Sequence, residues 1–137
     1  MEHQKSCGII PFAIKDGEIY VLLVKQTNDV VGFPKGHVEA GESEEETALR
    51  ECLEETAARV SLVEGFRQEI GYYMAEYDAY KTVVYFLGQL ENADFTKQES
   101  EISEICLCPV QEAMDRMIYE NQKELLAKAV AFIESGP

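Results

Sequence analysis

Apolar and β-branched residues recur in short runs along the chain, several of them alternating with polar residues, and this pattern is typical of β-strands. The strands that it predicts are residues 8–14, 19–24, 60–63, 66–74, 81–90 and 104–108. Between the first two runs, Asp16 and Gly17 form a dipeptide that accepts the positive φ of a tight turn. Residues 8–27 are therefore expected to form a β-hairpin, and a polar tip at residues 75–79 is expected to join the two longest strands.

The apolar period changes to that of a helix in three places, at residues 44–56, 110–119 and 122–134. In the first helix, the face expected to be buried carries Ala48, Leu49, Cys52, Leu53 and Ala57. Ser43 is a suitable N-cap for this helix, and Glu46 completes a capping box with it. Pro109 is suited to the start of the second helix. We expect one domain, residues 1–137, in which helices cover a mixed sheet.

Residues 28–41 contain four glycines or prolines and are expected to form a structured loop. The first residues, His3 among them, are expected to be a frayed tail. They lack the basic flank and apolar stretch of a signal peptide, and no apolar run approaches the length of a membrane span. A cytoplasmic location is therefore expected.

The charge of the chain is strongly negative, with 12 Lys and Arg against 26 Asp and Glu and a net charge of −14. An acidic surface argues against binding of nucleic-acid polymers, which need basic patches. A small anionic substrate is compatible with this charge if bound cations and a few placed lysines offset the repulsion. The expected partner is therefore a small molecule and not a nucleic acid or a membrane, and the oligomeric state is open.

The chain has four cysteines, which are Cys7, Cys52, Cys106 and Cys108. None of them forms a C-x-x-C pair, so neither a zinc site nor a disulfide framework is expected. Cys106 and Cys108 are two residues apart and would lie on one face of a strand. The simplest interpretation is four reduced, mostly buried thiols.

The chemistry of the chain is concentrated in residues 36–58. On a helix, Glu51 and Glu55 lie one turn apart on the same face, and Glu54 flanks them. Like charges this close destabilise a helix, although Arg50 can hydrogen-bond Glu54 one turn further on. A divalent cation such as Mg²⁺ would offset the rest, because it prefers carboxylate and phosphate oxygens. The alternative is a solvated acidic helix face without a site, which is common.

The spacing of these residues resembles the Nudix box, which reads Gly, five residues, Glu, seven residues, and then Arg-Glu-U-x-Glu-Glu-x-Gly-U, where U is aliphatic. The positions that match are Gly36, Glu42, Arg50, Glu51, Glu54 and Glu55. Two positions depart, since the box glycine is Ala57 and the final aliphatic residue is only Ala58. Alanine adopts a left-handed conformation poorly, so the helix is expected to end differently or to run longer.

This resemblance implies an α/β fold, the α/β/α sandwich of the Nudix family, and the hydrolysis of a phosphoanhydride bond. The implied ligands of Mg²⁺ or Mn²⁺ are the Gly36 carbonyl, Glu51 and Glu55. Glu54 would take a proton from the attacking water, Arg50 would orient the glutamates, and Glu42 would support the loop. Metal ions suit this reaction because they neutralise phosphoryl charge and activate water.

Residues 32–39, 64–66 and 81–86 extend the resemblance to the asymmetrical diadenosine tetraphosphate hydrolases within that family. By this likeness the side chains in contact with phosphates would be Lys35, His37, Lys81 and Tyr85. The two lysines could instead be ordinary surface residues, and the strand face that Lys81 and Tyr85 share with Val83 could be a packed surface. Val31 stands where this subfamily usually has Trp, and the tip before Lys81 is longer than expected. Both departures would reshape a nucleotide pocket.

The likeness also implies roles for Tyr72 and Glu101. Tyr72 would stack on a base, although a tyrosine is commonly a half-buried packing residue. Because Tyr72 and Tyr73 alternate between faces of the strand, one of the two is expected to be buried and the other free. Glu101 would be a further metal ligand or an alternative base, and it competes with Glu99 and Glu104 for that role.

The leading hypothesis is hydrolysis of a dinucleoside tetraphosphate to a nucleoside triphosphate and a monophosphate. One rival is another Nudix pyrophosphatase, acting on a nucleoside triphosphate, an RNA 5′ end or a nucleotide sugar. A second rival is a nucleotide-binding sensor without catalysis, which the presence of Arg50 and all three helix glutamates disfavours. The base that is recognised and the choice between Mg²⁺ and Mn²⁺ are open.

Overall fold

The computed structural model describes residues 1–136 and is built around a seven-stranded sheet. The strands are β1 (Glu2–Lys15), β2 (Glu18–Gln26), β3 (Val31–Gly32), β4 (Lys35–His37), β5 (Val60–Met74), β6 (Ala79–Leu90) and β7 (Ile102–Pro109). The order across the sheet is β3-β2-β1-β6-β5, and β4 pairs with β1 while β7 pairs with β2. β1 and β6 run parallel, and the remaining pairings are antiparallel. The sheet is therefore mixed, as the sequence predicts.

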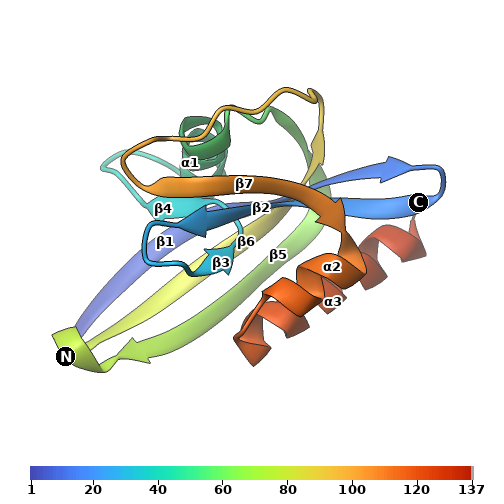
Figure 1. Ribbon diagram of the computed structural model, residues 1–137. Helices are drawn as coiled ribbons and strands as arrows, with labels where there is room; N and C mark the ends of the chain where they lie inside the picture. The colour runs from blue at the N-terminus through green and yellow to red at the C-terminus, as the bar shows by residue number, and fades with distance from the viewer. Residues whose placement is uncertain (137) are drawn as a thin grey trace.

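Helices cover both faces of this sheet. α1 (Glu44–Thr56) lies on one face, and α2 (Val110–Arg116) and α3 (Glu120–Ser135) lie on the other (Figure 1). A 3₁₀ turn, η1 (Ala75–Tyr77), closes the tip between β5 and β6. The arrangement is an α/β/α sandwich, which confirms the predicted fold class. No helix within residues 1–136 is both long and apolar enough to cross a membrane.

Each interface between the sheet and its helices has its own core. On one face, Ala48 and Cys52 of α1 pack with Ile9 of β1. On the other face, Leu126 of α3 packs with Ile10 of β1. Successive β1 residues thus enter opposite cores, because side chains alternate along a strand. A strand that is buried on both faces has a continuous run of apolar residues, and this run is the pattern that predicted β1.

The two ends of α1 compare differently with the predictions. Ser43 Oγ accepts the N–H of Glu46 at 3.1 Å, and the Glu46 carboxylate accepts the N–H of Ser43 at 2.8 Å, so the capping box is confirmed. At the other end the predicted last residue, Thr56, is confirmed. The expectation that Ala57 would change this end or lengthen the helix was wrong, because Ala57 adopts the left-handed conformation, with φ 60° and ψ 16°. Leu53 is 47% exposed, so its expected burial was also wrong. It lies one residue past the buried Cys52, and thus about 100° round the helix from the sheet.

Long-range pairing lengthens two strands beyond their predicted bounds. β1 begins at Glu2, and His3 pairs with Tyr80 of β6, the two rings 6.0 Å apart between centroids. The expectation of a frayed tail at His3 was therefore wrong. β5 is one strand where two were predicted, with an irregular register between Leu62 and Arg67. Gly65 adopts a φ of 95° within this irregular stretch.

The connections are more ordered than simple loops. The predicted structured loop at residues 28–41 contains β3 and β4. α2 ends at Arg116 and not at residue 119, and α3 begins at Glu120 and not at residue 122. An extended link of residues 117–119 therefore separates two helices that together cover one face of the sheet.

All four cysteines are free. Cys7, Cys52 and Cys108 are buried, and Cys106 is partly buried. This agrees with the predicted reduced and mostly buried thiols.

Candidate active site

Arg50 is the centre of a hydrogen-bond network between α1 and the loop before it. Its Nε and Nη2 donate to the two carboxylate oxygens of Glu42 at 2.6 and 3.0 Å. Nη2 also donates to the His37 carbonyl at 3.0 Å. Nη1 lies 3.3 Å from both Glu54 oxygens and 3.5 Å from Glu51 Oε2. One guanidinium therefore contacts the loop and two helix carboxylates, which is the geometry that an orienting residue needs.

Glu42 ties the loop to the helix. Besides the Arg50 contacts, its carboxylate accepts hydrogen bonds from Thr47 Oγ1 at 2.8 Å and from the N–H of Glu39 at 3.1 Å. The hydrogen bond from Arg50, above all, lowers the pKa of Glu42 from 4.5 to about 2. Glu42 is therefore ionised at neutral pH, and its hydrogen bonds join the loop to the helix.

Glu51, Glu54 and Glu55 form what we call the acidic face of α1, and Glu55 and Glu51 are its more buried part. Glu55 is 3% exposed, and its Oε2 has no hydrogen-bond partner within residues 1–136. Burial, and then the charge of Glu51, raises the pKa of Glu55 to about 8. Burial also raises the pKa of Glu51, against the opposing charge of Arg50. Two neighbouring carboxylates thus lie where the protein compensates their charge poorly.

The main chain of β4 lies directly against Glu51. A Cβ added to Gly36 would fall 1.9 Å from Glu51 Oε2 and 2.0 Å from its Cδ. β4 cannot retreat easily, because Gly36 pairs with Cys7 of β1. A side chain at this position would therefore displace the Glu51 carboxylate from its place against β4.

Glu54 differs from its two neighbours on α1. Glu51 and Glu55 share a face, as the spacing predicts, whereas Glu54 is exposed and turns toward Arg50. The three helix glutamates do not bring their oxygens within 4.8 Å of one another. Within residues 1–136, the group of potential ligands that does so is Cys106, Cys108 and Glu112.

Of the three glutamates that compete near the start of β7, Glu101 lies close enough to Glu51 and Glu55 for its charge to act on both. Its charge raises the pKa of both Glu51 and Glu55. Glu99 instead pairs with Lys97 at 3.8 Å, and Glu104 pairs with Arg116 at 3.2 Å. The geometry therefore favours Glu101 over its two rivals for a part in the site.

Two lysines lie next to this acidic face. The positive charge of Lys35, on β4, opposes the rise in the pKa of Glu55 that burial and Glu51 cause. Lys81, on β6, is 9% exposed, and burial together with the charge of Lys35 lowers its pKa to about 8. This placement does not fit ordinary surface lysines. His37 is exposed, and it reaches the network through its backbone carbonyl.

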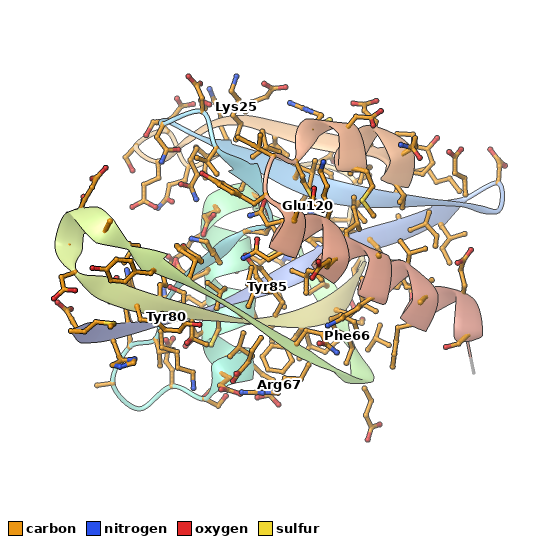
Figure 2. The ribbon with its side chains drawn as sticks, turned by 90° about the horizontal axis from the view of Figure 1, so that it is seen from below. Lys25, Phe66, Arg67, Tyr80, Tyr85 and Glu120 are labelled. Carbon is orange, nitrogen blue, oxygen red and sulfur yellow. The ribbon has the colours of Figure 1, made fainter. Side chains whose placement is uncertain are left out.

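A pocket of about 590 Å³, which we call the aromatic pocket, opens beside the lysines. Its lining includes Phe33, Lys35, Tyr72, Tyr77, Tyr85, Tyr119 and Gln122. Tyr72 lies opposite Lys81 in the β5–β6 register, so the two side chains share a face. Tyr85 is 1% exposed and lies near the middle of the sheet, whereas Tyr80, on the same strand, lies near the tip (Figure 2).

The expectation that one of Tyr72 and Tyr73 is buried was wrong. Tyr72 is 36% exposed and Tyr73 is 52% exposed. The end of the β5–β6 pair projects beyond the helices, so no helix packs across the strand ends there (Figure 1).

Sequence reasoning missed several residues of the pocket. Tyr119 was predicted to lie inside a helix, but it lies in the link before α3. The pKa of Tyr72 is raised mainly by burial, and Tyr119 is close enough to add to this rise. Gln122, on α3, is buried, and its Oε1 lacks a hydrogen-bond partner within residues 1–136. Gly8 lets Tyr85 approach β4, since a Cβ there would lie 2.8 Å from the ring. The only available signal was Tyr119 itself, which lies outside the apolar period that Val110, Ala113, Met114, Met117 and Ile118 follow.

The chain is similar to known proteins in sequence and in fold. The model of the NUDIX domain family matches residues 2–129. An asymmetrical bis(5′-nucleosyl)-tetraphosphatase of Sus scrofa is 37% identical over 101 residues, which cover 66% of this chain and 67% of that protein. The Rattus norvegicus protein of the same name is 31% identical over 145 residues and 97% of each chain. A crystal structure of a C. elegans Ap4A hydrolase binary complex has a TM-score of 0.89 at 27% identity, over 96% of this chain and 98% of that one.

Proposed function

This chain belongs to the Nudix hydrolase family, and on that premise we propose that it hydrolyses dinucleoside polyphosphates with the help of a divalent cation. The reaction proposed is cleavage of a dinucleoside tetraphosphate into a nucleoside triphosphate and a nucleoside monophosphate. The names of the Sus scrofa and Rattus norvegicus relatives support this substrate class.

The observation that carries the proposal is that Lys35 belongs to both parts of the site. Lys35 lines the aromatic pocket, and its charge also acts on Glu55 of the acidic face. A phosphate chain bound by Lys35 and Lys81 would therefore extend from a base in the pocket to the glutamates of α1. A nucleotide is a ligand that joins an aromatic ring to such a chain.

The residues of the acidic face fit a hard divalent cation. Glu55 presents a buried carboxylate oxygen that has no hydrogen-bond partner among residues 1–136, and Glu51 lies against the backbone of Gly36. Carboxylate and carbonyl oxygens are the ligands that Mg²⁺ and Mn²⁺ prefer. We therefore assign the Gly36 carbonyl, Glu51 and Glu55 as the ligands. The bound cation would neutralise phosphoryl charge and make the attacking water more acidic.

The other side chains would bind the substrate and move the proton. Glu54 is exposed next to the ligands and is the proposed base that takes the proton of the water, with Glu101 as the alternative. The positive charges of Lys35 and Lys81 would stabilise the negative charge that develops on the phosphates. Tyr72 would stack on the base, since the face of an aromatic side chain packs favourably against the face of a base.

The remaining assignments concern phosphate binding, the domain, the partner and the cellular location. His37 and Tyr85 would contribute to binding of the phosphate chain. Residues 1–137 would be a single Nudix domain, of which Pro137 lies outside the described residues. The partner would be a small nucleotide and not a nucleic-acid polymer, in keeping with the net charge of −14. The location would be the cytoplasm.

Product analysis tests the reaction directly. The protein is incubated with Mg²⁺ and, separately, with diadenosine tetraphosphate, nucleoside triphosphates and nucleotide sugars, and the products are separated by chromatography. We expect ATP and AMP from the dinucleotide and little turnover of the others. Cleavage in water enriched in ¹⁸O then shows which product carries the new oxygen, and so which phosphorus is attacked.

Other outcomes would replace parts of the proposal. Release of pyrophosphate from a nucleoside triphosphate as the main reaction would keep the acidic face and reject the substrate. Saturable binding of the dinucleotide without any turnover would make the protein a nucleotide sensor. Equal turnover with Mg²⁺ and in the presence of a chelator would reject the divalent cation.

A further inference from the structure

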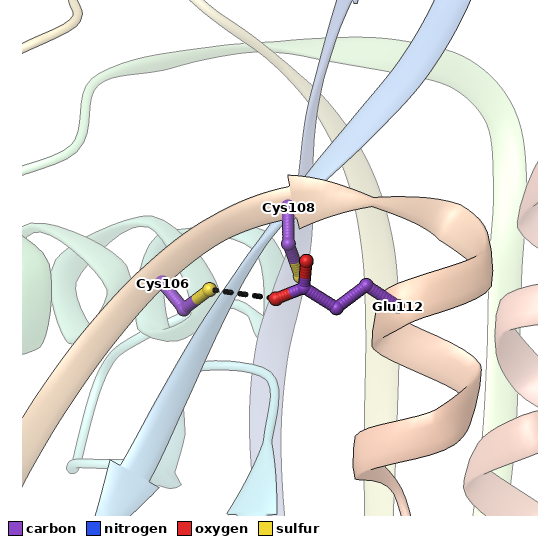
Figure 3. Close-up of side chains that lie close together, drawn as sticks. All are labelled: Cys106, Cys108 and Glu112. Atoms are coloured by element: carbon purple, nitrogen blue, oxygen red, sulfur yellow. Dashed lines mark hydrogen bonds between the residues drawn. The ribbon is translucent and has the colours of Figure 1, made fainter.

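A second group of potential metal ligands lies where β7 leads into α2, apart from the acidic face of α1. Cys106, Cys108 and Glu112 each offer one ligand atom, and these three atoms lie within 4.8 Å of one another. The Cys106 thiol donates to Glu112 Oε2 at 3.7 Å (Figure 3). The pair of thiols comes from the strand and the carboxylate from the helix, so the fold and not the local sequence brings them together.

The backbone fixes this arrangement. Cys106 and Cys108 are two residues apart on β7, so their side chains point to the same face, toward α2. Pairing with β2, in which Leu23 faces Cys106 and Val21 faces Cys108, holds that part of β7 in register. Glu112 lies in the first turn of α2, which begins directly after β7 ends. No C-x-x-C spacing is needed, because the chain reversal supplies the third ligand.

The separations suit tetrahedral coordination of a thiophilic cation. Zinc–sulfur bonds of about 2.3 Å and zinc–oxygen bonds of about 2.0 Å at a tetrahedral angle place sulfur and oxygen about 3.5 Å apart, and two sulfurs about 3.8 Å apart. The observed sulfur–oxygen distance between Cys106 and Glu112 is 3.7 Å. A disulfide fits less well, because Cα atoms two residues apart on a strand are separated by about 6.7 Å, at the upper limit for that bond.

The charges around the group also balance. Two thiolates and one carboxylate would carry three negative charges, against two positive charges on a divalent cation. Arg116 would supply the remaining positive charge, since it lies close enough to oppose the rise in the pKa of Cys108 that burial and the Cys106 thiol cause. Its Nη2 also donates to Glu104 at 3.2 Å, on the exposed side. Glu112 is exposed and Cys106 partly so, which gives an ion access from solvent.

We propose that Cys106, Cys108 and Glu112 form a binding site for a thiophilic divalent cation such as Zn²⁺, with water as the fourth ligand. The site is independent of the proposed cation on α1, whose ligands are hard oxygen atoms. An ion bound there would join β7 to α2. The link of residues 117–119 follows α2 directly and carries Tyr119 into the aromatic pocket, so the ion would also steady one wall of that pocket.

Cobalt titration tests the site without any measurement of activity. The full-length protein is reduced with a phosphine, titrated with Co²⁺ in the presence of excess Mg²⁺, and then with Zn²⁺. We expect one equivalent of Co²⁺ to produce a sulfur-to-cobalt charge-transfer band, which Zn²⁺ then removes. Co²⁺ bound by carboxylates of α1 gives no such band, so the signal reports only on thiolate ligands.

Variants on the exposed side of the site keep the fold intact. Cys106→Ser should weaken Co²⁺ binding by more than about tenfold, since losses outside the direct ligands already cost that much. Glu112→Gln should weaken binding but leave the band at saturation, because both thiolates remain. Asp115→Asn, on the same helix and with the same change of charge, is the matched control and should bind as the wild type does. Absence of the band, or a band unchanged by Cys106→Ser, would overturn the proposal.

Discussion

The acidic face of α1 and the aromatic pocket are neighbouring parts of one site, but the chain builds them in opposite ways. The acidic face comes from residues 36–58, a single loop and helix. The lining of the pocket comes from β2, β3, β4, β5, η1, β6, the link before α3 and the start of α3. The first is therefore visible as a spacing in the sequence, whereas the second exists only after distant segments have paired.

The two regions also differ in what holds them. Arg50 fixes the acidic face through hydrogen bonds to Glu42, Glu54 and the His37 carbonyl, so its geometry is set before substrate arrives. The pocket lies beside a projecting strand end with exposed tyrosines. We therefore expect changes in the acidic face to act on kcat and changes in the pocket to act on KM.

Glu54→Gln should give the largest effect. Loss of a general base typically costs about 10²–10⁴-fold in rate, and we expect kcat for diadenosine tetraphosphate to fall within this range. Stability should change little, because Glu54 is exposed and Arg50 keeps both contacts to Glu42. Steady-state kinetics and a urea titration measure the two quantities. Glu45→Gln, on the exposed first turn of the same helix, is the control, and a kcat unchanged by Glu54→Gln would pass the role of base to Glu101.

Tyr72→Ala should raise KM and spare kcat. Stacking of a base on an aromatic ring contributes about 1–3 kcal/mol, so KM for the dinucleotide should rise at least about fivefold. Tyr72→Phe keeps the ring and should behave as the wild type does, which separates stacking from the hydroxyl group. Tyr80→Ala removes a tyrosine that does not line the pocket and controls for strand stability. If KM is the same in Tyr72→Ala, the ring does not contact the base.

The features of α1 could be predicted because their causes are local. A capping box depends on residues three apart, and the shared face of Glu51 and Glu55 depends only on the helical period. The exposure of Leu53 could not be predicted, because it depends on how wide a stripe of α1 the sheet covers. The left-handed conformation of Ala57 was also missed, since propensity alone disfavours the conformation that the fold imposes there.

The remaining errors come from contacts between distant residues. His3 is ordered because β1 runs parallel to β6, a pairing that the pattern of either strand leaves open. Tyr119 enters the pocket because α2 ends early, and Glu112 reaches two cysteines because the chain turns at Pro109. Patterns within a segment predict the type of an element, whereas its partners and the sites between elements follow from tertiary packing.

Ala57→Gly should make the protein more stable. A left-handed alanine costs about 1–2 kcal/mol, and replacing it with glycine removes this cost. Part of the benefit is lost, because glycine has greater freedom in the unfolded chain. We expect a net increase of about 0.5–1 kcal/mol in the free energy of unfolding, measured by urea titration. Ala58→Gly, at the next position, removes a methyl group that is 2% exposed and should have the opposite sign. A loss of stability in Ala57→Gly would mean that the helix does not end in this conformation.

The smallest predicted effect concerns the first turn of α1, where the acidic region meets the sheet. Glu44 accepts hydrogen bonds from Arg67 of β5 at 2.8 and 2.9 Å and pairs with Lys5 of β1 at 2.6 Å. The Arg67 hydrogen bonds, followed by the Lys5 bond, lower the pKa of Glu44 from 4.5 to about 2. A carboxyl whose pKa is lower in the folded state contributes stability above its unfolded pKa, and loses it as the pH falls through the folded value.

We therefore expect Glu44→Gln to be less stable than the wild type at pH 7, by about 1 kcal/mol or less because the partners are exposed and screened. This difference should stay constant down to a pH near 4.5 and should vanish as the pH approaches 2. The comparison of wild type with variant at each pH cancels the titration of other groups, including Glu42. Added salt should shrink the difference at pH 7, because the pairs lie at the surface. A difference that persists unchanged at pH 2 would mean that packing by Glu44, and not its charge, joins α1 to the sheet.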